Sequence, residues 1–241
     1  MSGHSKWATI KRDKAKTDAA RGNVFTKIGR EIAIAVKNGG PDPANNPRLA
    51  TVIAKARANN MPNDNIQRSI KKASGELGQV NYEELVYEGY GPGGSAVMCE
   101  IVTDNKNRTS SDIRHIFDKA GGSLAGPGAV AYLFTRKAVV CVEAKNMSED
   151  DMTMLALDAD ADDVENDGDG YYTIYGQVSQ LQQIRQTCEN AGVKVESAEV
   201  EQVPNETITL DDGKYESFEK MLDKLEENDD VQNVYHNVEM K

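Results

Sequence analysis

Apolar residues recur at helical spacing in three runs within the first third of the chain. The first predicted helix starts near Asn23 and stops at Gly39-Gly40, because glycine accepts the left-handed C-cap conformation. The second starts at Asn46-Pro47, a capping residue followed by proline at the first helical position, and the third follows Pro62. These runs predict a small three-helix domain. Its apolar faces consist of Phe25, Ile28, Ile32, Ala35, Val36, Leu49, Val52, Ile53, Ala56, Ile66, Ile70 and Ala73.

From Tyr82 onward the apolar period changes to two, which is typical of strands. Leu85–Tyr90 and Ala96–Thr103 are predicted to form a hairpin around a glycine-rich turn. A helix is expected over Thr109–Ala120 and a strand over Ala129–Phe134. The chain therefore changes from a helical part to a mixed α/β part near residue 80.

A β-α-β-β-α-β order, which is the ferredoxin-like order, follows in residues 137–204. The predicted elements are Ala138–Glu143, Ser148–Leu157, Asp162–Glu165, Tyr171–Tyr175, Val178–Ala191 and Val195–Gln202. The flanking segments fit a second such unit, with Glu206–Leu210, Lys214–Glu227 and Val231–Asn237 completing it. We predict an α+β protein. It has a helical domain (1–80), a split α/β domain (81–136 and 205–241) and an inserted α/β domain (137–204).

Charge is distributed unevenly between the two parts of the chain. Residues 1–80 contain 15 Lys and Arg against 6 Asp and Glu, whereas residues 81–241 contain 13 against 33. The net charges are therefore +9 and −20, which sum to the −11 of the whole chain. The basic part is suited to a polyanion and the acidic part to basic protein surfaces. The alternative is that each part is simply made soluble by its own charge.

The three cysteines, Cys99, Cys141 and Cys188, are widely spaced and odd in number. Each falls on the apolar side of a predicted element, so we expect buried free thiols in a reducing cytoplasm. No signal peptide and no apolar run long enough to span a membrane is visible.

Two segments resemble ligand-binding motifs but fit turns better. GYGPGG (Gly89 to Gly94) is followed by a strand, not by the helix that a dinucleotide site requires. In DADADDVENDGDG, the sixth and twelfth positions counted from Asp158 are Asp163 and Asp169, where a calcium loop needs Gly and Glu. The three histidines are scattered. We therefore predict no enzyme, no metal site, no cofactor and no small-molecule substrate.

The basic N-terminal part is the best candidate site. Lys and Arg neutralise phosphates, and an aromatic side chain such as Trp7 can stack on an unpaired base. The alternative is that Trp7 packs on the helical domain while the charges are solvated. Residues 1–22 are expected to form an arm that is flexible when unbound. The predicted nucleic-acid-binding residues are Lys6, Trp7, Lys11, Arg12, Lys14, Lys16, Arg21, Lys27, Arg30, Arg48, Lys55, Arg57, Arg68, Lys71 and Lys72. Arg108, outside this part, either holds a phosphate or braces its loop.

Seven motifs spread over nearly the whole chain resemble the YebC/PmpR family. They are GHSKW (Gly3–Trp7), RGNVFTKIGREI (Arg21–Ile32), NGGPDPANNPRL (Asn38–Leu49), NNMPNDNIQRSIKK (Asn59–Lys72), YEGYGPGGSA (Tyr87–Ala96), TDNKNRT (Thr103–Thr109) and VYHN (Val234–Asn237). The resemblance implies three domains around a cleft, with the middle domain split in sequence. It also implies no reaction of the protein's own.

The resemblance offers two functions. One is a DNA-binding transcriptional regulator. The other is a ribosome-associated translation factor that contacts ribosomal RNA, as in relief of stalling at proline runs or activation of mitochondrial translation. No helix shows a clear base-reading pattern. An acidic body repels a long duplex but tolerates a mixed surface of RNA and basic ribosomal proteins, which favours the second function on physical grounds. The naming of the family favours the first.

Overall fold

The computed structural model describes residues 18–76 and 81–240, with side chains from Asn23 onward, together with Trp7 and Ile10 of the N-terminal segment. These residues form two compact units. The first comprises residues 18–129 and 212–234. The second comprises residues 130–211 and 235–240 together with Trp7 and Ile10. The predicted flexible arm lies largely outside the described residues, and the predicted domain division stays a prediction.

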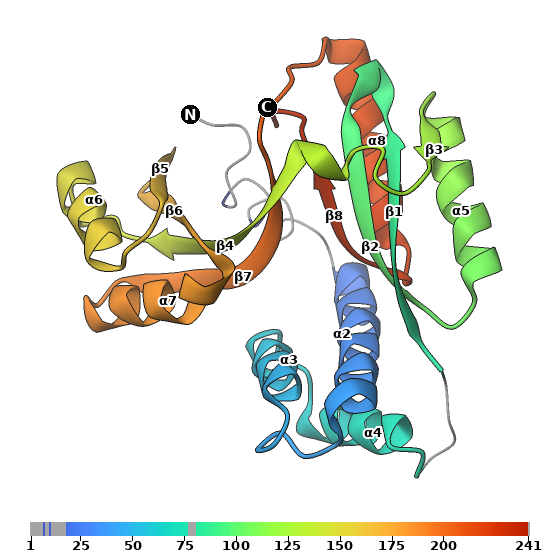
Figure 1. The fold of residues 1–241 in the computed structure, drawn as a ribbon, viewed down its shortest axis with the longest axis horizontal. Helices are drawn as coiled ribbons and strands as arrows, with labels where there is room; N and C mark the ends of the chain where they lie inside the picture. The colour runs from blue at the N-terminus through green and yellow to red at the C-terminus, as the bar shows by residue number, and fades with distance from the viewer. Residues whose placement is uncertain (1–6, 8–9, 11–17, 77–80, 241) are drawn as a thin grey trace. The chain divides into compact units, whose positions relative to one another are not determined.

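Three helices open the first unit (Figure 1). They are α2 (Asp18–Gly39), α3 (Pro47–Ala58) and α4 (Asn63–Ala73), so the predicted three helices are confirmed, although α2 begins more than a turn earlier than expected. The predicted apolar faces pack into one buried cluster, with Phe25 and Ala73 at its margin. Asn46 caps α3 by accepting from the Leu49 amide at 3.0 Å, and its side-chain amide donates to the carbonyl of Ala35 at 2.8 Å. The same side chain therefore caps one helix and holds it against another.

The sheet of the first unit has the strand order β3-β1-β2-β8. Its elements are β1 (Glu83–Tyr90), β2 (Ala96–Thr103), α5 (Lys106–Lys119), β3 (Ser123–Ala125), α8 (Asp212–Glu227) and β8 (Val231–His236), the last of which ends in the second unit. The predicted β1–β2 hairpin is confirmed and is antiparallel in register. The GYGPGG motif is its turn, with a short 3-10 segment over Pro92–Gly94. Helices α5 and α8 contact each other, and both contribute fully buried side chains: Ile113 and Phe117 from α5, and Phe218 and Leu222 from α8.

Two predicted strands of the split unit are wrong. Residues 129–133 lead into a 3-10 turn at Ala131–Leu133, and the strand after α5 is instead β3, which pairs with β1. The segment 206–210 contributes only one bridge, between Ile208 and Val238. The physical reason is that β2 has β1 on one side and β8 on the other, so no position beside it is left for this segment. The sheet therefore contains β1, from the start of the α/β part, and not residues 206–210 from its end.

The second unit contains a continuous ferredoxin-like fold, as predicted. Its elements are β4 (Phe134–Glu143), α6 (Glu149–Asp158), β5 (Asp163–Gly168), β6 (Tyr171–Gly176), a 3-10 turn (Val178–Gln180), α7 (Leu181–Asn190) and β7 (Lys194–Pro204). The antiparallel strand order is β5-β6-β4-β7. Side chains such as Val140 and Ile174 pack against α6 and α7, so both helices cover one face of the sheet.

The acidic segment at 158–170 forms the β5–β6 hairpin that the turn rules predict. Gly168, Asp169 and Gly170 all have positive φ, which suits a tight turn between antiparallel strands. Within the described residues, no group of three or more His, Cys, Asp or Glu side chains is placed to hold a metal ion.

All three cysteines are buried and free, as predicted. Burial raises the pKa of the Cys99 thiol to about 12 and that of the Cys188 thiol to about 11. Both thiols are therefore protonated and unreactive at neutral pH. None of the described helices combines the length and apolar character needed to cross a membrane.

Gly122→Ala is expected to lower the free energy of unfolding by about 1–3 kcal/mol. Its Cβ would meet the backbone carbonyl of Tyr90 and lie 3.1 Å from Gly91 Cα, and backbone atoms cannot move aside as a flexible side-chain tip can. Gly126→Ala is the matched control, because its Cβ would have no described atom within 4 Å. Thermal unfolding of the two variants measures the difference. Equal melting temperatures would contradict the prediction.

Candidate nucleic-acid interface

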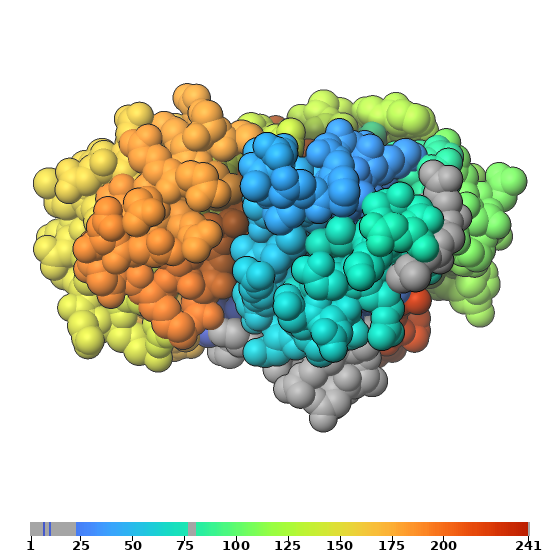
Figure 2. Space-filling model, turned by 90° about the horizontal axis from the view of Figure 1, so that it is seen from below, coloured from blue at the N-terminus to red at the C-terminus, as the bar shows by residue number. Residues whose placement is uncertain are grey.

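Four of the predicted basic residues form an exposed group at the surface of the helical region: Arg57 near the end of α3, and Arg68, Lys71 and Lys72 on α4. The spacing of the α4 residues places them together on the face opposite the buried Ile66 and Ile70. Figure 2 shows the atoms of α3 (cyan) and α4 (teal) at the surface of this unit. We call Arg57, Arg68, Lys71 and Lys72 the basic group.

The four cations of the basic group form no hydrogen bond or ion pair with any described residue. Their charges are therefore not neutralised within the described part of the chain. Unpaired, solvated cations on adjacent helices can replace the counterions of a phosphate backbone, which is the usual source of sequence-independent affinity for nucleic acid.

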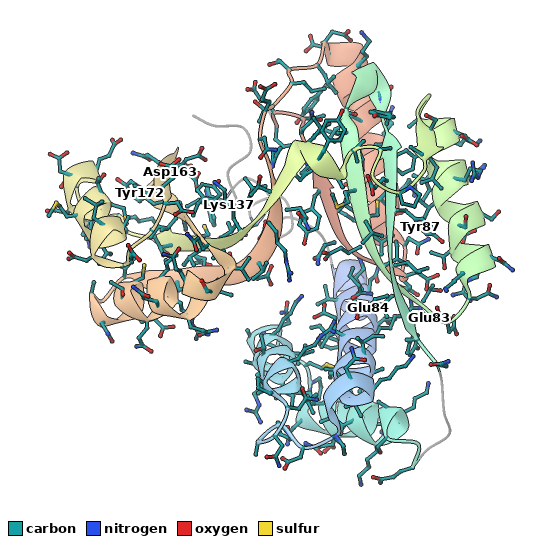
Figure 3. The ribbon with its side chains drawn as sticks, viewed as in Figure 1. Glu83, Glu84, Tyr87, Lys137, Asp163 and Tyr172 are labelled. Atoms are coloured by element: carbon teal, nitrogen blue, oxygen red, sulfur yellow. The ribbon has the colours of Figure 1, made fainter. Side chains whose placement is uncertain are left out.

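Other predicted basic residues are engaged with the protein itself. Arg48 forms a bidentate ion pair with Glu84, which lies beside Glu83 at the start of β1 (Figure 3). Lys55 pairs with Glu31 at 2.9 Å. Lys27 donates to the backbone carbonyl of Glu226 at 2.6 Å. The Arg48 pair is about half exposed, so a phosphate could replace its carboxylate at small cost.

Arg30 is largely buried and has a structural role. Its side chain is 13% exposed, and its guanidinium forms an ion pair with Asp230, whose side chain is 5% exposed. It also donates to the backbone carbonyls of Asp229 at 2.7 Å and Val102 at 3.1 Å. These contacts join α2 to β2 and to the turn before β8. Arg30 is therefore unavailable to a phosphate while this network is intact.

Asp230 is the centre of that network. The Thr109 hydroxyl donates to its carboxylate at 2.6 Å and Arg108 at 3.0 Å. Arg108 also pairs with Asp104 at 2.9 Å. Of the two roles considered for Arg108, the structure shows the bracing one. The N-cap of α5 is Asn105, whose side chain accepts a hydrogen bond from the Arg108 amide.

Acid is expected to weaken the first unit through Asp230. Burial alone would raise the pKa of Asp230, but hydrogen bonds from Thr109, Arg108 and Arg30 outweigh it and hold the pKa below the ordinary value of 3.8. A lowered pKa means that the carboxylate contributes stability above its unfolded-state pKa, and this contribution is lost as the pH falls through the folded-state pKa.

We therefore expect the urea midpoint of the protein to fall as the pH drops below about 4. The fall should be smaller in Asp230→Asn, because the amide has no proton to take up. Urea titrations of both proteins across this pH range measure the difference, and equal acid sensitivity would contradict the prediction.

Trp7 stacks on Tyr171 of β6, with ring centroids 3.4 Å apart and an interplanar angle of 8°. This differs from both readings of the sequence, which placed Trp7 on a base or on the helical domain. Stacking of Trp7 on a nucleobase stays a prediction, and it would require the Trp7–Tyr171 pair to open. No sequence signal connects two aromatic residues so far apart along the chain.

The remaining predicted contacts, Lys6, Lys11, Arg12, Lys14 and Lys16, lie outside the described residues, as does the side chain of Arg21. The structure therefore leaves Arg57, Arg68, Lys71 and Lys72 exposed on α3 and α4, whereas Arg30 is held by an ion pair with Asp230. Sequence alone could not make this distinction, because a partner such as Asp230 is 200 residues away.

Comparison with known proteins places the whole described chain in one family. Residues 5–76 match the model of the TACO1/YebC protein N-terminal domain, and residues 82–238 match that of the TACO1/YebC second and third domain. A crystal structure of the conserved hypothetical protein Aq1575 from Aquifex aeolicus superposes with a TM-score of 0.84 at 44% identity, covering 94% of this chain and 93% of that one.

Similar full-length proteins carry a common name. A protein of Thermoanaerobacter pseudethanolicus is 52% identical over 100% of this chain and 98% of its own length. One of Acetivibrio thermocellus is 54% identical over 98% of each chain. Both are named "Probable transcriptional regulatory protein". With domain models that together span nearly all of its length and relatives more than half identical, the chain belongs to the TACO1/YebC family.

Proposed function

We propose that the protein is a non-enzymatic regulator of gene expression that binds nucleic acid, and that it acts as a transcriptional regulator on DNA. The observation that carries the proposal is the basic group, four exposed cations on α3 and α4 that pair with no described residue, in a chain whose net charge is −11. The names of the relatives support transcription as the process.

The contact that we propose is with phosphates and not with bases. The basic group consists of Lys and Arg on short helices, and these are the side chains that contact phosphates in any DNA sequence. Affinity should therefore depend strongly on salt and weakly on sequence. Recognition of particular genes would need a further determinant, such as DNA shape or a partner protein.

In the sequence analysis, the preference for RNA was based on the acidic body, which repels a long duplex, and the RNA hypothesis also assigned base stacking to Trp7. That ring is held against Tyr171, so the stacking argument no longer separates unpaired RNA from duplex DNA. Ribosomal RNA is therefore an outcome of the test and not a second proposal.

The test is crosslinking of the tagged protein in cells, followed by sequencing of both bound DNA and bound RNA. We expect enrichment of promoter DNA that is lost when the basic group is replaced by glutamine. The matched control replaces four exposed cations on α5 and α8, namely Arg114, Lys119, Lys220 and Lys224, and should retain binding. Ribosomal RNA crosslinks without promoter DNA would overturn the transcriptional proposal in favour of translation.

A further inference from the structure

The sheet of the second unit has an acidic face on the side opposite α6 and α7. Strand alternation directs Val140 and Ile174 toward the helices, so their neighbours Cys141, Thr173 and Tyr175 lie on the other side. Figure 3 labels Lys137 and Asp163, which lie on this face, and Tyr172, which belongs to the helix-covered one. We define the acidic face by its carboxylates Asp163, Glu165, Asp167, Glu199 and Glu201.

Four of these carboxylates lie at one end of the face, around Tyr175, whereas Asp167 accepts a hydrogen bond from Thr173 at 2.6 Å, nearer the other end. The Tyr175 hydroxyl donates to Glu165 at 3.1 Å, and the Lys137 ammonium lies 5.9 Å from the ring centroid. Burial raises the pKa of Tyr175, and the nearby charges of Glu165, Asp167 and Glu201 raise it further. The region is thus rich in negative charge and suited to basic side chains.

A stacked pair of aromatic rings lies at the other end of β6. Tyr171 lies on the same face as Tyr175, four residues earlier on β6, and Trp7 covers its ring in a parallel stack. Lys145 lies 5.6 Å from the Tyr171 centroid. Tyr171 is buried and Trp7 is half-buried, so the contact excludes water from a large aromatic surface.

Charge and reach both favour the chain's own N-terminal segment at this face. Lys6, Lys11 and Arg12 flank Trp7 in the sequence, and Lys14 and Lys16 follow. Four residues of chain span at most about 14 Å, and four residues of β6 span about 13 Å. Trp7 and Ile10 are helical, and four residues of helix advance about 6 Å. The cations at positions 11 and 12 therefore reach the carboxylates around Tyr175 only with their long side chains extended or with the segment partly unwound.

We propose that the acidic face is a docking site for the chain's own basic N-terminal segment, with Trp7 on Tyr171 as the anchor, and that this docking competes with nucleic acid. The inference rests on the proposed function and on the sequence prediction that the cations of this N-terminal segment also contact phosphates. A polyanion and the acidic face cannot both neutralise the same cations. The second unit therefore lowers the affinity of the free protein and favours targets with dense phosphate charge.

The single tryptophan makes the docking directly measurable. In free protein, Tyr171→Ala should move the Trp7 emission to longer wavelength and increase its quenching by iodide, because the ring becomes exposed. The variant should also bind a short fluorescein-labelled DNA duplex about two- to ten-fold more tightly. This is the change in affinity that corresponds to the loss of one stabilising aromatic pair. Equal emission and equal quenching in wild type and variant would overturn the docking. A changed emission with unchanged affinity would overturn the competition.

A second variant protects the test against loss of folding at the buried Tyr171. Glu199→Gln/Glu201→Gln removes two charges from the acidic face without touching either ring, and it should shift the emission and the affinity in the same directions. The control Asp150→Asn/Asp158→Asn removes two exposed charges on α6, on the opposite side of the sheet, and should leave the emission unchanged. A shift in the control as large as that in the variant would overturn the docking.

The two proposals can fail separately. If none of the proteins binds the duplex, the proposed function is wrong, and the emission of the free proteins still decides the docking. If the duplex binds and the emission never changes, the docking is wrong and the proposed function stands.

Discussion

Asp230→Asn is expected to lower the free energy of unfolding by about 3–5 kcal/mol, the usual cost of removing one partner of a buried ion pair. The substitution preserves shape but leaves Arg30, whose side chain is 13% exposed, without its counter-charge. It also removes the charged acceptor of Thr109 and Arg108. A loss of this size is comparable with the whole stability of a marginal domain.

Urea unfolding followed by far-UV circular dichroism measures the effect. The matched control is Glu84→Gln, which removes the partner of Arg48 from a pair whose two side chains are each 46% exposed. That change should cost no more than about 1 kcal/mol, because water solvates the freed arginine. If the two variants were equally stable, the Arg30–Asp230 pair would not be the brace that its burial indicates.

A second substitution separates the charge from the packing. Adding Arg30→Met to Asp230→Asn removes the uncompensated cation while keeping a long side chain at that position. The double variant should therefore be more stable than Asp230→Asn alone, although Arg30 has other contacts with Val102 and Asp229. A further loss of stability would mean that those backbone contacts outweigh the charge effect.

The parts of the fold that follow from local pattern were predictable. Asn46-Pro47 and Gly39-Gly40 fix helix ends by local backbone chemistry, and the apolar faces of α2, α3 and α4 follow from the helical period. The β-α-β-β-α-β order of the second unit was also visible. Each of these features depends on residues only a few positions apart.

Long-range pairing was not predictable in the same way. The β1–β2 hairpin follows from adjacent segments, because a short loop closes with a small loss of chain entropy. No such local signal gives a partner to residues 206–210, and β2 has β1 on one side and β8 on the other. Residues 206–210 were then left with one bridge.

The sequence predicted which basic residues belong to the candidate site, but not which of them are held by other residues of the protein. The sequence identified the basic residues of α2, α3 and α4 as one class, whereas the structure divides them by their partners. Arg30 and Arg68 have the same chemistry, yet one is held by Asp230 and the other is exposed on α4. Partner and burial, not residue type, decide which cations can meet a phosphate.

Replacing the basic group by glutamine is expected to weaken binding to a DNA duplex on the order of a hundred- to a thousand-fold at about 0.1 M salt, because each lost phosphate contact removes one released counterion. The slope of log affinity against log salt should become shallower by about 0.9 for each contact, and so by about 3–4 in total. Fluorescence anisotropy with one labelled duplex at several salt concentrations measures both quantities.

The change in slope is the decisive quantity, since a variant that merely unfolds would lose affinity without this defined dependence on salt. Exposed cations on solvated helix faces contribute little to stability, so the variant should retain the melting temperature of the wild type. The control at Arg114, Lys119, Lys220 and Lys224 carries the same change in net charge and should alter the slope by less than one contact. Equal slopes in the two variants would mean that affinity follows the net charge of the protein and not contact at α3 and α4.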